Sequence, residues 1–234
     1  MVERKLEHLF VYVFKPYLHG LPMIKLDIYS DPICPWCYIG KSYLDRALEK
    51  TVDHPFNIQW HPFQLNPDMP IEGMDRKTYL ENKFGNRDLA IKAYLPVVEH
   101  AKLAGLDLQL DKIAKTPNTL AAHRLIFWAW QEGLQSALIS SLFRAYFIKG
   151  EDIGKKRVLI NLSKDSGLDE ALITRLLEGK NDSEHIVKLD QSARRMGINS
   201  VPTFIVNGQH VVTGAQNVEF WTNLILEINN NLRN

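Results

Sequence analysis

The chain has 234 residues, of which 45% are hydrophobic and 24% are charged, and its formal net charge at pH 7 is +1. These values are typical of a globular protein with a full hydrophobic core. So small a net charge predicts no general attraction to nucleic acid or to an anionic membrane surface. No apolar run approaches the ~18 residues that are needed to span a bilayer.

The first 22 residues precede the first clear strand. They contain one short apolar stretch, Leu9 to Phe14, which Lys15 and Pro16 interrupt, and no small-x-small cleavage site follows it. The segment is therefore a poor signal peptide, and two cysteines in the chain are too few for a disulfide-stabilised secreted scaffold. We expect a cytoplasmic protein in which residues 1–22 are an extension, with Met23 as an alternative first residue.

Two strands and one helix are predicted after this segment. Ile24–Tyr29 and Phe56–Trp60 are short, apolar and rich in strand-forming residues. Between them, Pro35 to about Lys50 has helical spacing, and the proline is acceptable in the first turn because an N–H there has no helical partner. Residues 61–73 are punctuated by prolines and are expected to form a loop.

Residues 75–197 have a helical pattern, with glycines close to the expected helix ends. The predicted helices cover residues 75–84, 88–104, 118–132, 134–148, 155–165, 169–177 and 183–196. The chain then returns to strands, since residues 203–206 and 210–213 flank Asn207-Gly208, which is typical of a two-residue type I′ hairpin. A last helix is expected over residues 217–232.

The order of these elements predicts an α/β fold. A strand, a helix and a strand come first, a long helical block follows, and a hairpin and a helix end the chain. We expect one discontinuous domain formed by residues 23–74 and 198–234, with residues 75–197 as a large α-helical insertion between its two halves.

Cys34 and Cys37 are the only cysteines in the sequence, and they form a C-x-x-C at the start of the first predicted helix. The N-terminus of a helix favours a thiolate on the first sulfur, and the thiolate is the form that attacks disulfides. We predict dithiol–disulfide chemistry in which Cys34, partly exposed at the helix N-cap, is the nucleophile. Cys37, one turn further in, is predicted to resolve the mixed disulfide.

Other interpretations of the cysteine pair are weaker. A structural disulfide across so short a loop would constrain the unfolded chain very little. A zinc site needs further ligands, and the sequence has neither a second cysteine pair nor an H-x3-5-H pattern. We therefore predict no metal site, whereas two inert buried thiols remain an alternative.

Pro202 stands at the start of the predicted strand 203–206, where a residue without an N–H is unusual. A cis Val201–Pro202 bond packed against the cysteine pair would explain it, although trans is the common form of such bonds. Val201 can then offer its backbone N–H and C=O to an extended peptide or a glutathione-like substrate. Trp36, Val201 and Pro202 are the predicted substrate-binding residues.

These elements together resemble the DsbA family of thioredoxin-fold oxidoreductases, specifically its FrnE-like branch. The resemblance covers about Met23 to the C-terminus and is carried by Asp31-Pro32-Ile33-Cys34-Pro35-Trp36-Cys37-Tyr38-Ile39-Gly40-Lys41, Trp60-His61-Pro62-Phe63-Gln64-Leu65-Asn66-Pro67, Lys83-Phe84-Gly85, Pro117-Asn118-Thr119, Ala122-His123-Arg124-Leu125, Ala145-Tyr146-Phe147, Val201-Pro202-Thr203-Phe204 and Gly214-Ala215-Gln216. It implies a thioredoxin-like fold with a large α-helical insertion between its two halves. It also implies a thiol–disulfide oxidoreductase with Cys34 and Cys37 as redox pair and Pro202 as cis proline.

The same superfamily includes 2-hydroxychromene-2-carboxylate isomerase and kappa-class glutathione transferase. Those enzymes typically have serine where Cys34 stands and an aspartate in the stretch that matches Gly214-Ala215-Gln216, so this sequence disfavours them as alternatives. A redox-switched, chaperone-like binding protein is a further alternative. We expect no cofactor beyond the redox-active disulfide, with glutathione as a candidate co-substrate. The expected partners are disulfide- or thiol-containing proteins or glutathione.

Several polar residues in these motifs are further candidates. His61 and His123 can line the groove over Cys34 and carry protons, although structural histidines are more common. Asp31 precedes the cysteine motif, where a turn or capping role is expected and tuning of a sulfur pKa is the alternative. Asn66 and Asn118 are candidates for contact with a substrate.

Overall fold

The computed structural model describes residues 17–18, 21–51, 53–180 and 182–233. Most of the expected N-terminal extension lies outside the described residues, including the stretch Leu9 to Phe14 on which the signal-peptide interpretation rests. The described part of the extension forms two short antiparallel strands, β1 (Tyr17–Leu18) and β2 (Leu21–Pro22).

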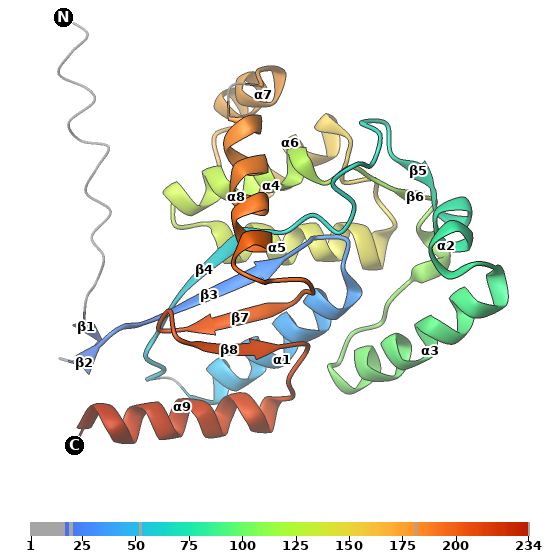
Figure 1. The fold of residues 1–234 in the computed structure, drawn as a ribbon. Coiled ribbons are helices and arrows are strands. Elements are labelled where there is room, and N and C mark those ends of the chain that lie inside the picture. The colour runs from blue at the N-terminus through green and yellow to red at the C-terminus, as the bar shows by residue number, and fades with distance from the viewer. Residues whose placement is uncertain (1–16, 19–20, 52, 181, 234) are drawn as a thin grey trace, which may run out of the picture.

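A four-stranded sheet in the order β4-β3-β7-β8 lies at the centre of the fold (Figure 1). β3 (Ile24–Ser30) pairs parallel with β4 (Phe56–Pro62) and antiparallel with β7 (Thr203–Val206), and β7 pairs antiparallel with β8 (His210–Thr213). All four strands were predicted from the sequence. The sheet therefore joins two parts of the chain that are separated by the whole helical region.

The turn between β7 and β8 has the predicted type I′ form. Asn207 and Gly208 have φ angles of 54° and 68°, so both central residues occupy the left-handed region that this turn requires. Asparagine and glycine are the residues that tolerate this conformation best, which explains why the sequence signal was specific.

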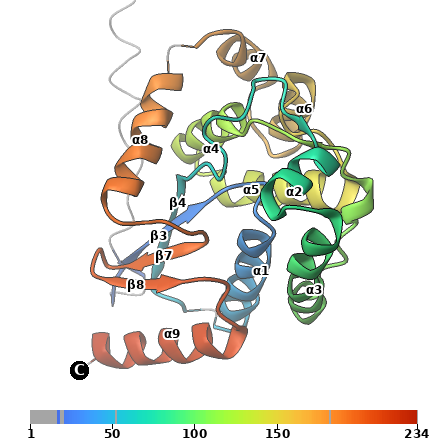
Figure 2. The same ribbon diagram turned by 45° about the vertical axis from the view of Figure 1, so that its right-hand side comes forward.

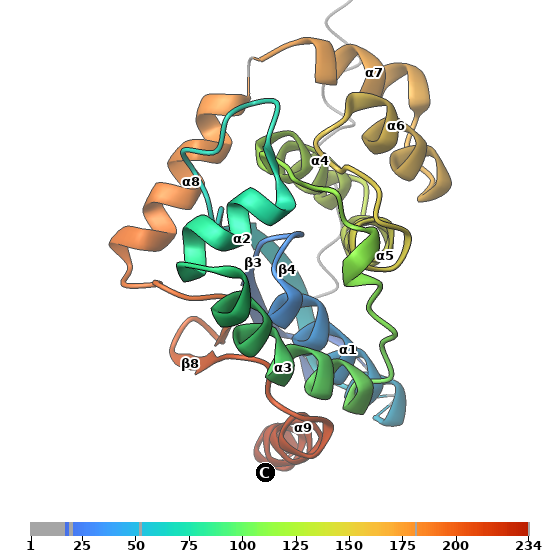
Figure 3. The same ribbon diagram turned by 90° about the vertical axis from the view of Figure 1, so that its right-hand side faces the viewer.

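Helices cover both faces of the sheet (Figure 2). α1 (Pro35–Lys50) lies on one side with α9 (Val218–Arg233) packed against it, and α8 (Ser183–Arg195) packs against β4 on the other side (Figure 3). Between the sheet and α9, the rings of Phe204 and Trp221 are fully buried and meet edge-on, with centroids 4.7 Å apart.

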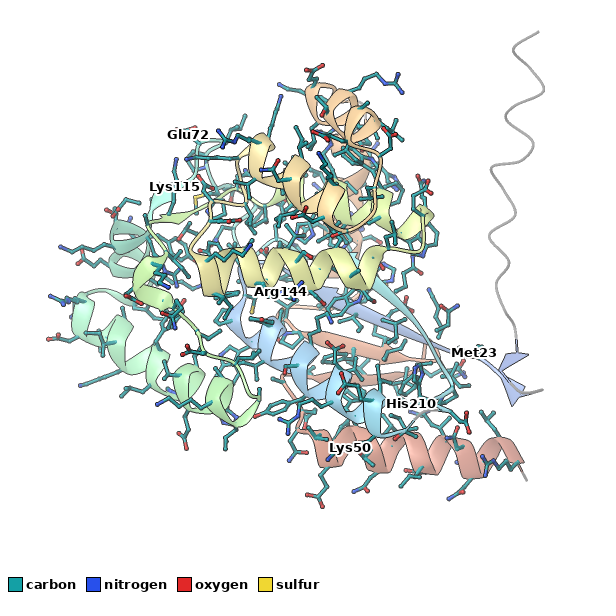
Figure 4. The ribbon with its side chains drawn as sticks, turned by 180° about the vertical axis from the view of Figure 1, so that it is seen from behind. Met23, Lys50, Glu72, Lys115, Arg144 and His210 are labelled. Atoms are coloured by element: carbon teal, nitrogen blue, oxygen red, sulfur yellow. The ribbon has the colours of Figure 1, made fainter. Side chains whose placement is uncertain are left out.

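The remaining helices lie between β4 and β7 in the sequence. They are α2 (Arg76–Phe84), α3 (Arg87–Leu103), α4 (Leu120–Gln131), α5 (Gln135–Arg144), α6 (Lys156–Asp165) and α7 (Glu170–Glu178). Figure 4 shows α5 above α1, with Arg144 at the end of α5 and Lys50 at the end of α1 near α9. The predicted helices of residues 75–197 are confirmed within a few residues at each end.

The structure differs from the sequence prediction at short elements. The helix predicted over residues 134–148 changes at Ala145 to π-helical hydrogen bonding, which continues to Lys149. The two-residue strands β5 (Met74–Asp75) and β6 (Lys115–Thr116) and the 3-10 turn Leu110–Lys112 were not predicted, because elements so short carry no hydrophobic period.

The fold is α/β, as predicted. The boundaries of the proposed insertion, residues 75–197, and of the two flanking segments stay a prediction. In the described part of the chain, no helix combines the length and the apolar character that crossing a membrane would take.

Candidate functional site

The two cysteines lie at the N-terminus of α1, at the end of the sheet where β3 stops. Cys34 is the N-cap residue, and its backbone N–H donates to the carbonyl oxygen of Asp31 at 2.9 Å. The carbonyl oxygen of Cys34 accepts from the N–H groups of Cys37 and Tyr38 at 3.1 and 3.3 Å. The positive end of the helix dipole therefore faces Cys34, as the sequence predicts.

Both thiols are free and buried, which corrects the prediction that Cys34 is partly exposed. The exposed fraction is 4% for Cys34 and 0% for Cys37. Cys34 is covered because the Val201 segment lies against it, and the Cys34 Sγ is 3.6 Å from the carbonyl oxygen of Val201. Burial raises the pKa of the Cys37 thiol well above its ordinary value, and the neighbouring Cys34 raises it further.

The Val201–Pro202 peptide bond is cis, as the sequence analysis expected. Pro202 needs no N–H for the sheet, since the pairing of β7 with β3 begins at Thr203. The carbonyl oxygen of Pro202 accepts from the N–H of Gly214 at 2.8 Å, which ties this segment to the end of β8. The structure thus brings Val201 and Pro202 against the cysteine helix from a distant part of the sequence.

Gly40 allows this close approach. A Cβ atom built on Gly40 would lie 3.1 Å from the Pro202 Cγ and 3.4 Å from the Ala215 Cα. The former distance is too short for an ordinary carbon contact, so a glycine at this position of α1 lets the Pro202 and Ala215 segments pack on the helix. Gly40 and Ala215 both belong to motifs that were singled out in the sequence.

Trp36 lies between the two cysteines and is partly buried. Its ring meets His100 of α3 edge-on, with centroids 5.3 Å apart, and α3 is joined to α1 by further bonds from Ser42, Tyr43 and Arg46. The other face of α3 exposes apolar side chains, namely Ile91, Leu95, Val98 and Leu103. The catalytic roles of the cysteines and the substrate-binding roles of Trp36, Val201 and Pro202 stay predictions.

Asp31 organises the turn between β3 and α1. Its Oδ1 accepts from the N–H of Ile33 at 3.3 Å, and its Oδ2 accepts from the N–H of Leu65 at 2.7 Å and from the Thr119 hydroxyl at 3.5 Å. These bonds confirm the turn role that was expected. They also connect the turn before Cys34 to the loop after β4 and to the start of α4.

Burial dominates the electrostatics of Asp31. The side chain is completely buried, and desolvation raises the pKa of the carboxyl group to about 7 although three hydrogen bonds act to lower it. His123 of α4 lies 3.7 Å from Asp31, from Nε2 to Oδ1, and burial lowers the pKa of its imidazole to about 4. His123 is therefore neutral at pH 7, and its contact with Asp31 is not an ion pair there.

The other candidates from the sequence have structural partners. His61 pairs with Asp27 at 2.5 Å and stacks on Tyr29. Asn118 donates to the carbonyl oxygen of Met69 and accepts from the N–H of Leu120, so both ends of its side chain are used within the fold. The Asn66 Oδ1 accepts from the Tyr79 hydroxyl.

Sequence reasoning missed a buried polar cluster next to Asp31. Asp190 of α8 accepts from the backbone N–H of Gln64 at 2.7 Å and from Arg194, and Arg194 also donates to the carbonyl oxygen of Gln64. The Gln64 side chain donates to the Thr119 hydroxyl at 3.4 Å. No local signal identifies Asp190, because its partner lies 126 positions away in the chain.

Among the described residues, no group of three or more His, Cys, Asp and Glu side chains is arranged to hold a metal ion. A small cavity that neither cysteine lines is bordered by Ser30, His61 and His123 together with apolar side chains. The two free thiols and the polar side chains of this cavity are the groups that the site presents.

Comparison with known proteins gives consistent results. The family described as DSBA-like thioredoxin domain matches residues 25–225. The uncharacterised protein YwbO of Bacillus subtilis (strain 168) is 27% identical over 194 residues, which cover 82% of this chain and 90% of YwbO. A probable DsbA oxidoreductase from Streptomyces coelicolor has a similar structure, with a TM-score of 0.77 and 24% identity over 87% of this chain and 89% of that one. The cytosolic disulfide reductase DsbM from Pseudomonas aeruginosa, solved with GSH, has a TM-score of 0.64 and 20% identity over 89% of this chain and 100% of that one.

The two thiols are expected to differ in reactivity. In the folded protein at pH 7, iodoacetamide should modify Cys34 at least about tenfold faster than Cys37, because Cys37 is fully buried and its pKa is raised. Mass spectrometry of partially alkylated protein measures the two rates. Faster modification of Cys37 would reverse the assigned roles.

The raised pKa of Asp31 predicts a specific dependence of stability on pH. The carboxyl group is protonated more readily in the folded state, about pH 7, than in the unfolded chain, about pH 4. Its contribution to the free energy of unfolding is therefore fully present below pH 4 and is lost as the pH rises through 7, by roughly 4 kcal/mol. Urea unfolding of the native protein and of Asp31→Asn at several pH values tests this. Their difference should change across pH 4–7, and parallel curves would contradict the shift.

Proposed function

The chain belongs to the family of DsbA-like thioredoxin domains, and from this premise we propose that it is a thiol–disulfide oxidoreductase with Cys34 as nucleophile and Cys37 as resolving thiol. The family supports an enzyme of the thiol oxidoreductase superfamily. The observation that carries the finer assignment is the position of Cys34 at the N-terminus of α1 with Cys37 fully buried one turn behind it.

The proposed reaction consists of two exchange steps. The Cys34 thiolate attacks one sulfur of a substrate disulfide, a Cys34–substrate disulfide forms, and the other substrate sulfur leaves as a thiolate. Cys37 then attacks the Cys34 sulfur, a Cys34–Cys37 disulfide forms, and the second substrate thiolate leaves. The substrate is reduced by two electrons and the enzyme dithiol is oxidised. The same steps in reverse oxidise a substrate dithiol.

The geometry supports a role for the Val201 segment in substrate binding. The Val201 carbonyl oxygen lies 3.6 Å from the Cys34 Sγ, so a chain that binds along Val201 brings its sulfur to Cys34. Pro202 packs against α1 at Gly40 and holds the segment there, and Trp36 borders the cysteines on the side of α3. Trp36, Val201 and Pro202 are thus the proposed contacts for the substrate.

We propose that the substrates are glutathione and proteins that contain thiols or disulfides. We also propose that the protein acts in the cytoplasm. DsbM is described as a cytosolic disulfide reductase and was solved with glutathione, and its fold is shared by this chain. The reaction needs no cofactor beyond the Cys34–Cys37 pair.

Trapping experiments test the division of roles between the cysteines. Cys37→Ala should accumulate a mixed disulfide with a protein substrate or glutathione, because the resolving thiol is absent, and Cys34→Ala should accumulate none. Non-reducing electrophoresis and mass spectrometry measure the adducts. Equal trapping by both variants would remove the nucleophile–resolver distinction. If Cys34→Ala retained full binding of unfolded protein and the native protein showed no turnover, the chaperone-like binding protein would replace this proposal.

A second test concerns the glutathione-dependent alternative. A transferase or isomerase needs no second cysteine, so its activity would persist in Cys37→Ala. We expect little conjugation of glutathione to a chlorodinitrobenzene-type electrophile by either form, since Cys34 stands where those enzymes typically have serine. Robust conjugation that survives Cys37→Ala would favour the transferase over the oxidoreductase.

A further inference from the structure

One face of α3 exposes a continuous row of apolar side chains, and Figure 3 views the molecule from the side on which this helix lies. The exposed fractions are 50% for Ile91, 61% for Leu95, 37% for Val98 and 63% for Leu103. These four side chains line one continuous depression of the surface. Single exposed apolar residues are ordinary in proteins, whereas a contiguous patch of them indicates an interaction site.

The fold already uses a different side of the same helix. Ala90, Val97 and Ala101 are its buried residues, and three side chains of α1 donate to carbonyl oxygens at its C-terminal end. Ile91 and Val98 each stand one residue after a buried one, which turns them about 100° around the helix axis. The helix therefore has two apolar stripes, of which the fold covers only one in the described structure.

The spacing of the exposed stripe fits another helix. Ile91, Leu95 and Val98 are separated by four and then three residues, which is the spacing of the apolar seam between two paired helices. A helix that packs on this stripe would cover the apolar side chains and leave the flanking polar ones at the edge of the contact.

Four charged side chains border the exposed stripe. Asp88 and Lys92 lie in the first half of α3, and Glu99 and Lys102 lie in the second half. All four are exposed, and within the part of the chain that the structure describes none of them takes part in an ion pair. They are therefore available to charges on a neighbouring molecule.

The order of these charges is complementary to itself when two copies of α3 lie antiparallel. If Leu95 of each copy lies on a two-fold axis, Asp88 comes opposite the partner's Lys102, and Lys92 comes opposite the partner's Glu99. Symmetry repeats both pairs on the other side of the axis. A parallel arrangement would instead place each of these charges beside its own copy, and like charges repel. The pattern thus selects a second copy of this chain in one orientation.

We propose that two copies of this chain form a two-fold symmetric dimer through the exposed face of α3, with the two helices antiparallel and Leu95 at the axis. Removal of the apolar stripe from water supplies most of the free energy of association. The flanking charges fix the direction and the register, because exposed ion pairs contribute little energy themselves. This inference goes beyond the proposed function and does not depend on it.

The size of the contact sets the strength that we expect. α3 has 17 residues and is about 25 Å long, with a width of about 10 Å. A pair of such helices covers less than the ~800 Å² per partner of a standard stable interface. The core of one chain is complete without the partner. We therefore expect a reversible dimer with a dissociation constant in about the micromolar range.

Sedimentation velocity over a concentration series tests the dimer. The mass of the native protein should rise with concentration from the 26.9 kDa of one chain toward twice that value. Leu95→Glu places two carboxylates at the axis and should raise the dissociation constant at least about tenfold. Leu226→Glu is the matched control, since Leu226 lies on α9 with an exposed fraction of 50%. It should leave the dissociation constant within about threefold of native.

Reversal of two charges tests the orientation. Lys102→Glu should weaken the dimer about threefold or more, because the new carboxylate would face the partner's Asp88. Addition of Asp88→Lys to this variant should restore the native dissociation constant within about threefold, since both pairs are then present with exchanged signs. A parallel dimer would show no such recovery, because positions 88 and 102 of its two copies would lie far apart.

Several outcomes would overturn this inference. A native protein that keeps the mass of one chain up to about 100 µM forms no such dimer. If Leu95→Glu weakens a native dimer no more than Leu226→Glu does, the contact lies elsewhere. Failure of Asp88→Lys to rescue Lys102→Glu would reject the antiparallel register. If the native protein is monomeric and Leu95→Glu slows the reduction of a protein disulfide but not of glutathione disulfide, the face binds substrate polypeptides instead. The mass measurements do not involve the cysteines, so the dimer and the proposed function fail separately.

Discussion

The close approach of the Val201–Pro202 segment to the N-terminus of α1 is the constraint on which the site depends. Cys34 and Val201 are 167 positions apart in the sequence, and the antiparallel pairing of β7 with β3 brings them together. Gly40 favours this approach, because a Cβ atom there would lie 3.1 Å from the Pro202 Cγ and the ring would have to shift. The sheet register therefore brings the thiols and the proposed substrate-binding segment together, and the glycine lets them pack closely.

The same packing buries both cysteines, with an exposed fraction of 4% for Cys34 and 0% for Cys37. A buried thiol is stable as the neutral form, so the environment of Cys37 opposes the thiolate that a resolving cysteine must become. The two hydrogen bonds from Ser30 and Asp31 act in the other direction and lower its pKa. In the proposed reaction the site thus combines a fully buried sulfur with two polar groups that act to lower its pKa.

The sequence predicted the fold well because its signals were local. The C-x-x-C with Pro35, the Asn207-Gly208 turn and the helical periods each act over a few residues, and each is confirmed. The burial of Cys34 could not be predicted in the same way, since the segment that covers it comes from the other end of the chain. The same holds for Asp190, whose partner on the Gln64 backbone has no pattern in the sequence.

The contacts of Asp31 show that the helical region takes part in the site and does not only cover the sheet. Its carboxyl group meets Thr119 and His123 at the start of α4, and the N–H of Leu65 after β4. A change in the packing of α4 would therefore alter the hydrogen bonds and the desolvation of Asp31, and through the turn it would alter the position of Cys34. Because the carboxyl group is fully buried, each of these contacts has a large effect on its ionisation. The sheet positions the sulfurs, and the helical region contributes to the electrostatic environment of the proposed redox site.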